Sequence, residues 1–250
     1  MTYYFSLSLT HEEICQLLEI NPYESIEAKE KIERFEYYFH MMLKFHGKIL
    51  METLKNEKLK TVYKGYQISY TDLKIDPDVL FIGFNSSVHY LKTNLNQFVE
   101  DFKPIEEHEL NILSEEVLIC FREAGKNVIL DNTVAISCCF FTTNSNEELK
   151  VFMDNLPEHL REIVQVMSII WTRNLINFIN PKIIICLGNE SFYYLRDIVY
   201  YNEITVIENK NPPLEAKIEN IPIISCQRTG STIINKDPLI KKLEEYYGTK

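Results

Sequence analysis

Polar side chains follow the ends of several apolar runs in this sequence, and their types suit the recognition of a small ligand. The run Val79–Ile82 leads into Gly83-Phe84-Asn85-Ser86-Ser87. The three polar groups are Asn85, Ser86, Ser87 and His89; Asp131 and Asn132; and Gln227, Arg228, Thr229 and Ser231. If the runs are parallel strands, their carboxyl ends share one edge of a sheet, where α/β proteins bind ligands. We therefore expect the three groups to converge on one site.

These side chains are amides, hydroxyls and one guanidinium group. An amide donates and accepts hydrogen bonds together, which suits the edge of a nucleobase. Arginine and hydroxyl groups suit a phosphate or a developing anion. The three groups contain no carboxylate pair, no Cys/His pair and no G-x-S-x-G motif. The residue types therefore favour a site for a base or a phosphate.

Each candidate residue also has a purely structural interpretation, which stays open at this point. The serines after Gly83 can cap the next helix, and Asn132 can bond its own backbone in a turn. His89 can be a surface or packing histidine, and Arg228 can pair with one of the many surface carboxylates. The three groups together make a stronger argument for a site than any one residue.

Alternating helical and strand patterns predict the elements that carry these groups. Apolar residues at helical spacing predict a long helix from Ser25 to about Leu54, after a short helix that begins at the capping box Thr10–Glu13. Further helices are expected near 96–102, 106–124, 155–178, 190–200 and 238–247. Core strands are expected at 78–83, 134–141, 182–188 and 221–225, with a loop over 84–96, a small strand at 66–70 and an edge strand at 204–207.

The alternation of buried strands with helices predicts the fold class. It implies right-handed crossovers and a mostly parallel sheet that is covered on both faces. We expect an α/β protein: a three-layer α/β/α sandwich with a mostly parallel central sheet of about four strands and an N-terminal helical extension. The extension spans residues 1–75 and packs on the core, which spans residues 76–250.

Charge and cysteine usage restrict the partners and cofactors. A formal net charge of −10 disfavours tight binding to extended duplexes or to anionic membranes. The six cysteines include no C-x-x-C pair, so no zinc, iron–sulfur or other cofactor is expected. Cys138, Cys139, Cys186 and Cys226 are expected to be buried reduced thiols. Without a signal peptide or a membrane-length apolar run, a cytoplasmic protein is expected.

The first motifs resemble the uracil-DNA glycosylase superfamily. That family begins its catalytic core with an apolar strand that ends in Gly-x-(Asp/Asn/Ala)-Pro-(Tyr/Gly). Gly83–Ser87 is similar to this motif and puts Asn85 on the position of the catalytic Asp or Asn. The family's second strand has an Asn that reads the base, and Ile129–Val134 resembles it, which places that residue at Asn132.

Two later motifs extend the resemblance over about residues 76–245. The family's long helix followed by Pro-Lys-apolar-Leu-Gly is similar to the stretch Asn180–Asn189. Its final strand and His-Pro-Ser-like loop correspond to Ile223–Ser231, where Ser231 matches the serine. Ser86 and Ser87 replace the family's Pro and its Gly or Tyr. No His stands in the last loop, where either Arg228 or Thr229 takes its position, and the four spaced cysteines of the iron–sulfur members are absent.

The resemblance implies a role for each candidate residue. Asn85 orients water, because a neutral amide cannot take a proton as a carboxylate does. Asn132 reads the base, and Arg228 stabilises the departing base or holds a flanking phosphate. Tyr90 or Phe98 stacks on the base. The remaining residues expected to line the ligand are Gly83, Phe84, Ser86, Ser87, Thr229 and Ser231.

The resemblance implies a DNA glycosylase-like protein that binds an extruded base, uracil or a related or damaged base, and hydrolyses the N-glycosidic bond. Its expected partner is DNA that is single-stranded or has an extruded base, or else a free nucleobase or nucleotide. The sequence also allows a protein partner. The alternative is an inactive module on the same fold that binds a nucleobase, a nucleotide or DNA. A flavodoxin-like domain for a small phosphorylated ligand is a third interpretation, which the absence of a Gly-rich loop disfavours.

Overall fold

The computed structural model describes residues 23–66, 73–87, 115–143, 145–207, 213–229, 232–233 and 236–248, together with Glu12, Cys15 and Asn21. Within these ranges the chain divides into two compact units. Of the longer described segments, the first unit contains 23–66, 85–87, 139–143 and 145–179, and the second contains 73–84, 115–138, 180–207, 213–229, 232–233 and 236–248. The predicted boundary at residue 75 stays a prediction.

The described strands form one seven-stranded sheet and a small hairpin. The sheet strands are β1 (Gly65–Tyr66), β2 (Val79–Ser87), β3 (Thr133–Thr143), β4 (Ile184–Leu187), β5 (Ile204–Ile207), β6 (Glu215–Ile218) and β7 (Ile221–Cys226). Their order is β1-β3-β2-β4-β7-β6-β5, and β8 (Arg228–Thr229) pairs with β9 (Thr232–Ile233) in the hairpin. β4 is parallel to β2 and β7, while β1, β6 and β5 are antiparallel to their neighbours.

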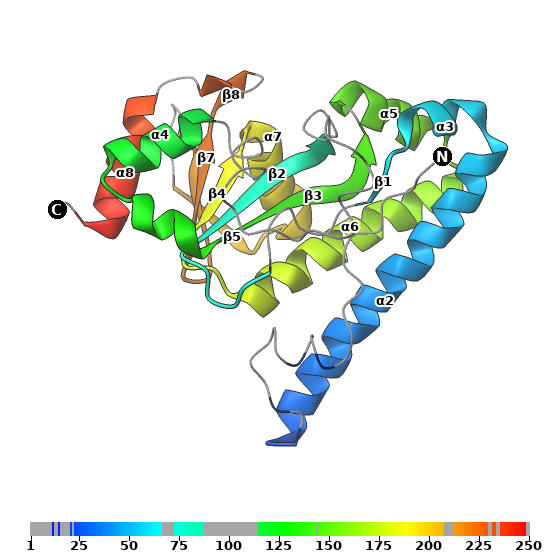
Figure 1. The fold of residues 1–250 in the computed structure, drawn as a ribbon, viewed down its shortest axis with the longest axis horizontal. Coiled ribbons are helices and arrows are strands. Elements are labelled where there is room, and N and C mark those ends of the chain that lie inside the picture. Colours follow the sequence, from blue (N-terminus) through cyan, green and yellow to red (C-terminus); the bar gives the residue numbers. More distant parts are fainter. Residues whose placement is uncertain are drawn as a thin grey trace. The chain divides into compact units, whose positions relative to one another are not determined.

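The first unit is built around two long helices, α2 (Ile26–Lys55) and α6 (Glu158–Ile179). Ser25 caps α2 by accepting a hydrogen bond from the Ala28 amide, as the sequence indicates. The two helices run side by side (Figure 1), and Phe35 of α2 packs 5.7 Å from Trp171 of α6. The short helices α3 (Glu57–Val62) and α5 (Asn146–Asn155) complete the unit.

A buried polar pair lies in the aromatic core of the first unit. His46 Nδ1 and the Tyr63 hydroxyl are hydrogen-bonded at 2.5 Å, and Tyr63 stacks on Phe152 of α5. Burial lowers the pKa of His46 to about 4, so this imidazole is neutral near pH 7. The pair therefore joins α2 to the segment after α3 without placing a charge in the core.

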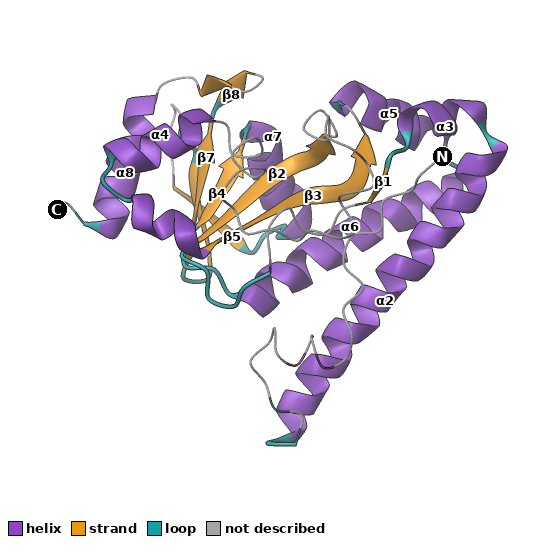
Figure 2. Ribbon diagram, viewed as in Figure 1, coloured by secondary structure: helices purple, strands orange, loops and turns teal. Residues whose placement is uncertain are grey.

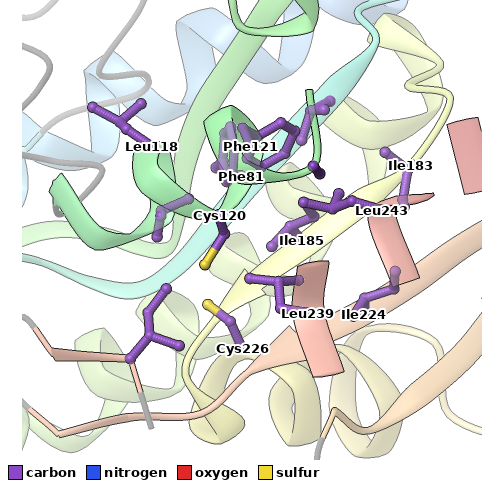
Figure 3. Packing of buried hydrophobic residues seen from close by; sticks show 14 of the residues in the cluster. Phe81, Leu118, Cys120, Phe121, Ile183, Ile185, Ile224, Cys226, Leu239 and Leu243 are labelled. Atoms are coloured by element: carbon purple, nitrogen blue, oxygen red, sulfur yellow. The ribbon is translucent and has the colours of Figure 1, made fainter. Parts of the chain in front are cut away.

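The second unit has helices on both faces of its sheet (Figure 2). The helices α4 (Glu115–Glu123) and α8 (Lys236–Tyr247) pack together and cover the face that carries Phe81, Ile185 and Ile224. Figure 3 shows this cluster, with the sulfur atoms of Cys120 and Cys226 turned toward each other. The opposite face meets α7 (Asn189–Tyr194), which continues as the π-helical segment η4 (Leu195–Val199).

The predicted fold class is confirmed. The protein is α/β with a largely parallel central sheet and helices on both faces, which agrees with three layers. The sheet has seven strands where about four were expected, because β1, β5 and β6 extend it on its two sides. The edge position of Ile204–Ile207 and the helices over 25–54, 155–178 and 238–247 are confirmed within a few residues.

Several boundaries differ from the expectation. Residues 84–87 continue β2 and are not a loop. After β7, the last core strand, the chain continues into the β8–β9 hairpin. α5 and β6 were not predicted. The expected helices at 10–20 and 96–102, the start of the one at 106–124 and most of the strand at 66–70 lie outside the described residues. No helix in the described ranges is long and apolar enough to cross a membrane.

Candidate functional site

Asn132 lies at the amino end of β2 and β3. It is the last residue of the 3₁₀ helix η3 (Asn127–Asn132), which precedes β3. Its side-chain amide donates to Oδ2 of Asp78 at 3.2 Å, and its carbonyl accepts from the Asp78 amide at 2.8 Å. Gly83 is five residues beyond Asp78 in the chain, so it lies roughly 17 Å from Asp78 at the usual rise of a strand. The expectation that Asp131 and Asn132 join the carboxyl ends of the strands is wrong, because residues 128–132 lead into β3 as a helical turn.

The same amino edge is closed by further hydrogen bonds. Asp78 Oδ1 accepts from Lys182 Nζ at 2.6 Å, and the Asp78 carbonyl accepts from the Tyr247 hydroxyl at 2.8 Å. Asn180 donates to Oδ1 of Asp76 at 2.6 Å. The hydrogen bond and charge of Asp78 raise the pKa of Lys182, so the ammonium stays charged. These contacts tie β2 to the segments before β4 and β3 and to α8.

The carboxyl edge of the second unit is set by the register of three parallel strands. Ile82 lies opposite Cys186, and Cys186 lies opposite Ser225. Continuing this register by one residue aligns Gly83, Leu187 and Cys226. Next to β2 on the other side lies β3, where a methyl group added at Gly83 would come 3.7 Å from Ser137 Oγ. The Asp78 amide bonds the Asn132 carbonyl, and Gly83 lies next to Ser137. The residue numbers rise together on both strands, so β2 and β3 also run parallel.

The strand order places a topological switch point between β2 and β4. The chain first passes from β2 to β3 on one side, and later enters β4 on the other side of β2. In open α/β sheets, the connections on the two sides of such a point lead away from each other, so the carboxyl ends of the two strands border a ligand site. In this protein β4 ends at Leu187 and is followed by Gly188 and Asn189, and at the same level β2 carries Gly83 and Phe84 before it continues to Ser87.

Phe84 supplies an aromatic surface at this edge. Its ring meets the ring of Tyr194 on α7 edge to face, with 5.7 Å between the centroids. Phe84 is half-buried, and so is Gln227, which follows β7. Phe84 and Gln227 are thus expected site residues whose side chains are described at the carboxyl edge.

Gly188 and Asn189 are not among the residues predicted for the site. Gly188 has φ +107° and ψ +157°, a conformation that only glycine adopts readily. A methyl group added there would meet no atom of the described residues within 4 Å. The Asn189 Oδ1 atom is buried and has no hydrogen-bond partner among the described residues. Gly-Asn directly after the apolar run 183–187 is the sequence signal that marks this pair.

The other predicted site residues are described only in part. Asn85, Ser86 and Ser87 have strand backbone in β2, and Arg228 and Thr229 have strand backbone in β8, but their side chains lie outside the described set. Tyr90, Phe98, Ser231 and His89 lie outside the described residues altogether. The hairpin that carries Arg228 is anchored on α4, because Glu116 accepts from the Ile233 amide and lies 3.6 Å from Lys236 Nζ.

Burial keeps Cys120 and Cys186 from acting as activated nucleophiles. Cys138, Cys186 and Cys226 are buried and not in disulfides, as predicted, whereas Cys139 is half-buried. Burial raises the pKa of Cys120 to about 11 and also raises the pKa of Cys186, so both are thiols near pH 7. Across the described ranges, no group of three or more His, Cys, Asp or Glu side chains could hold a metal ion.

No protein-family model matches this sequence, and no curated protein matches it either. The argument about function therefore depends on the fold and on the residues at the two edges of the sheet.

Proposed function

We propose that this protein binds a base extruded from DNA, uracil or a related or damaged base, at the carboxyl edge between β2 and β4, and hydrolyses the N-glycosidic bond that joins this base to its sugar. The observation that carries the proposal is the switch point between these two strands, with Gly83 and Phe84 on one side and Gly188 and Asn189 on the other. The resemblance of Gly83–Ser87 to the glycosylase motif falls on the same strand end.

The residue types at this edge support a base as the ligand. A base has an aromatic face and a polar edge, so its site needs an aromatic or apolar surface and amide-like partners. Phe84 and Tyr194 supply aromatic rings, and Asn189 and Gln227 supply amides. Gly188 leaves the end of β4 without a side chain. Asn132 is no part of this proposal, because it bonds Asp78 at the opposite edge.

In the catalytic form of the proposal, two predicted residues keep their roles. Asn85, one residue after Phe84 on β2, orients the attacking water through its amide. Arg228, on the hairpin after β7, stabilises the negative charge of the departing base or holds a flanking phosphate. The proton of the water then passes to solvent or to the leaving base, because an amide does not accept it.

The second candidate function is binding without hydrolysis. It is favoured by the amides Asn189 and Gln227 at this edge, since neither side chain is a general base near pH 7. A base-binding protein of this kind would recognise a nucleobase or nucleotide and release it unchanged.

One experiment separates these functions. Purified protein is incubated with three substrates: single-stranded DNA with uracil, single-stranded DNA with hypoxanthine, and duplex DNA with a mismatched thymine. Excision is read as alkali-labile strand breaks. The wild type, Asn85→Ala and the control Asn220→Ala are compared, where Asn220 is an exposed residue in the β6–β7 turn. Excision by the wild type and the control but not by Asn85→Ala supports the enzyme. Thermal stabilisation by uracil without excision supports the binding protein. The absence of both effects contradicts the proposal.

A further inference from the structure

The buried cluster under α4 contains two cysteines that face each other. Cys120 lies on α4, and Cys226 is the last residue of β7. Figure 3 shows their sulfur atoms turned toward each other between the helix and the strand. Burial raises the pKa of Cys120 to about 11, and the neighbouring Cys226 thiol adds to this shift, which indicates that the two thiols lie close together. Neither is in a disulfide, so the structure shows the reduced pair.

The sheet separates this pair from Cys186. Successive side chains of a strand point to opposite faces, and Ile224 and Cys226 share the face that α4 covers. Cys186 directly follows Ile185, which belongs to the same covered face, so Cys186 points to the other face. There its thiol contacts the Ser191 hydroxyl of α7. A bond between Cys186 and Cys226 would therefore have to pass through the sheet.

Cys138 and Cys186 are also too far apart to be joined. They lie on β3 and β4, and β2 lies between these strands. Two strand spacings amount to about 10 Å, whereas a disulfide needs Cα atoms within about 7 Å of each other. Among the described cysteines of the second unit, Cys120 and Cys226 are thus the couple that can form a disulfide without a rearrangement of the sheet.

A bond at this place would act next to the anchor of the β8–β9 hairpin. Cys226 comes two residues before Arg228, the first residue of the hairpin. Cys120 lies one helical turn after Glu116, which accepts a hydrogen bond from the Ile233 amide of the hairpin. A disulfide would add a covalent link to this contact. It would also close a loop of about 100 residues, which restricts the unfolded chain and so stabilises the folded one.

We propose that Cys120 and Cys226 are a redox couple that closes to a disulfide under sustained oxidation and fixes α4 to the end of β7. This inference does not depend on the proposed function. The oxidant is a small organic disulfide. One cysteine thiolate attacks a sulfur atom of the oxidant and releases one half of it, and the second cysteine thiolate then displaces the other half. The two cysteines lose two protons and two electrons, and the oxidant takes them up as two thiols.

The environment of Cys120 makes this reaction slow. Burial raises its pKa most, Lys236 of α8 opposes this effect, and Cys226, Glu123 and Glu116 add to it. With a pKa of about 11, roughly one Cys120 side chain in 10,000 is a thiolate at pH 7. The couple therefore responds to prolonged rather than brief oxidation.

The test exposes the folded full-length protein to an excess of 2-hydroxyethyl disulfide for many hours and then alkylates the remaining thiols. Tryptic digestion without reduction, followed by mass spectrometry, identifies the bonded cysteines. The peptides that end at Arg122 and Arg228 contain Cys120 and Cys226 and no other cysteine. Thermal unfolding of the oxidised and reduced proteins is measured in parallel. The variants are Cys120→Ser and, as a matched control, Cys138→Ser, which removes a buried thiol from the opposite face.

The oxidised wild type should contain these two peptides linked to each other and should weigh about 2 Da less than the reduced protein, the mass of the two hydrogen atoms lost. Its midpoint of thermal unfolding should be roughly 5–10 °C higher. Cys138→Ser should behave like the wild type. Cys120→Ser should form no bond at Cys226 and should show no shift of the midpoint on oxidation.

Three other results overturn the proposal. The first is a wild type that forms no internal disulfide, and the second is a disulfide that joins other cysteines. The third is a bond between Cys120 and Cys226 that forms only in urea, because the folded arrangement then does not bring the two thiols together. The peptide mapping needs only the wild type, so it decides between these results even if a variant does not fold.

Discussion

The two edges of the parallel strands in the second unit differ in how their polar groups are satisfied. At the amino edge, both carboxylate oxygens of Asp78 accept hydrogen bonds, from Lys182 and from Asn132, and its carbonyl accepts one from Tyr247. At the carboxyl edge, Asn189 has a buried oxygen without a described partner, and no described residue comes within 4 Å of a methyl group placed on Gly188. Each edge has an asparagine next to a strand: the Asn132 side chain bonds Asp78, whereas the Asn189 oxygen has no partner among the described residues.

This difference indicates that the amino edge serves mainly stability and the carboxyl edge mainly ligand binding. A closed hydrogen-bond network contributes to folding and leaves few groups for a ligand. An edge with unpaired groups gives up some stability, which functional sites commonly do. Substitutions at the amino edge should therefore change stability without changing ligand binding. Substitutions of carboxyl-edge side chains should do the reverse.

The largest effect on stability is expected from the backbone of the carboxyl edge. Gly188→Ala puts a side chain at φ +107° and ψ +157°, which should cost about 2 kcal/mol in the free energy of unfolding, measured with urea. Gly83→Ala is the matched control, because the added methyl group meets Ser137 Oγ at 3.7 Å, an ordinary contact. An equal loss in both variants would contradict the special role of the Gly188 conformation.

The next effect is expected at Asp78. Asp78→Ala removes the acceptor of Lys182 and Asn132 and should lower the free energy of unfolding by about 1.5 kcal/mol. Uracil binding should stay as in the wild type, because the carboxylate lies at the amino edge. Asp154, an exposed residue of α5, provides the control Asp154→Ala, for which little change is expected. If Asp78→Ala is as stable as the wild type but binds no base, the proposed difference in role between the two edges is wrong.

A smaller effect, with a pH dependence, is expected at Tyr247. Tyr247→Phe removes the hydrogen bond to the Asp78 carbonyl and should cost about 1 kcal/mol at pH 7. Burial raises the pKa of Tyr247, so the folded state keeps the proton after the unfolded chain begins to lose it near pH 10. The wild type should therefore lose stability as the pH rises above about 10, and the variant should lose less. Equal pH profiles in urea titrations between pH 8 and 11 would exclude this linkage.

The smallest effect is expected from the pair of asparagines. Asn132→Ala loses the bond to Asp78 and should cost somewhat less than about 1 kcal/mol, whereas Asn189→Ala should leave stability within about 0.5 kcal/mol of the wild type or raise it. Urea titrations of the two variants under the same conditions measure the difference. If Asn189→Ala is the more destabilised of the two, its oxygen is bonded in the folded protein and the comparison of the edges fails.

Much of the fold was predictable, because long periodic segments determine their own structure. α2 and α6 follow from apolar spacing and from caps such as Ser25, and β4 and β7 follow from short β-branched runs. α5 also had a local signal, since Ser145 is followed three residues later by Glu148, whose amide it caps. β6 had a weaker one, the alternation of buried Ala216 and Ile218 with charged residues.

The candidate site was less predictable than the elements around it. Phe84 was expected at the ligand and lies at the carboxyl edge, whereas Asn132 was expected there and lies at the other end of the strand. The error came from the stretch 128–132, whose apolar residues look like the end of a strand but form a 3₁₀ turn before β3. The three apolar residues 128–130 fit either structure, and pairing within the sheet decides where the strand begins.

Local sequence patterns predict the long helices, the core strands and their apolar faces, and they show that polar residues follow Ile82 and Leu187. These properties depend on side chains a few residues apart. The position of β4 beside β2, with β3 on the other side, which creates the switch point at Gly83 and Gly188, became visible only in the folded chain. The same is true of the hydrogen bond of the Asn132 amide and of the Asn189 oxygen, which has no partner among the described residues. Strand order and hydrogen-bond partners depend on contacts between residues far apart in the chain, such as Asp78 and Lys182 at 104 positions, and local periodicity contains no information about them.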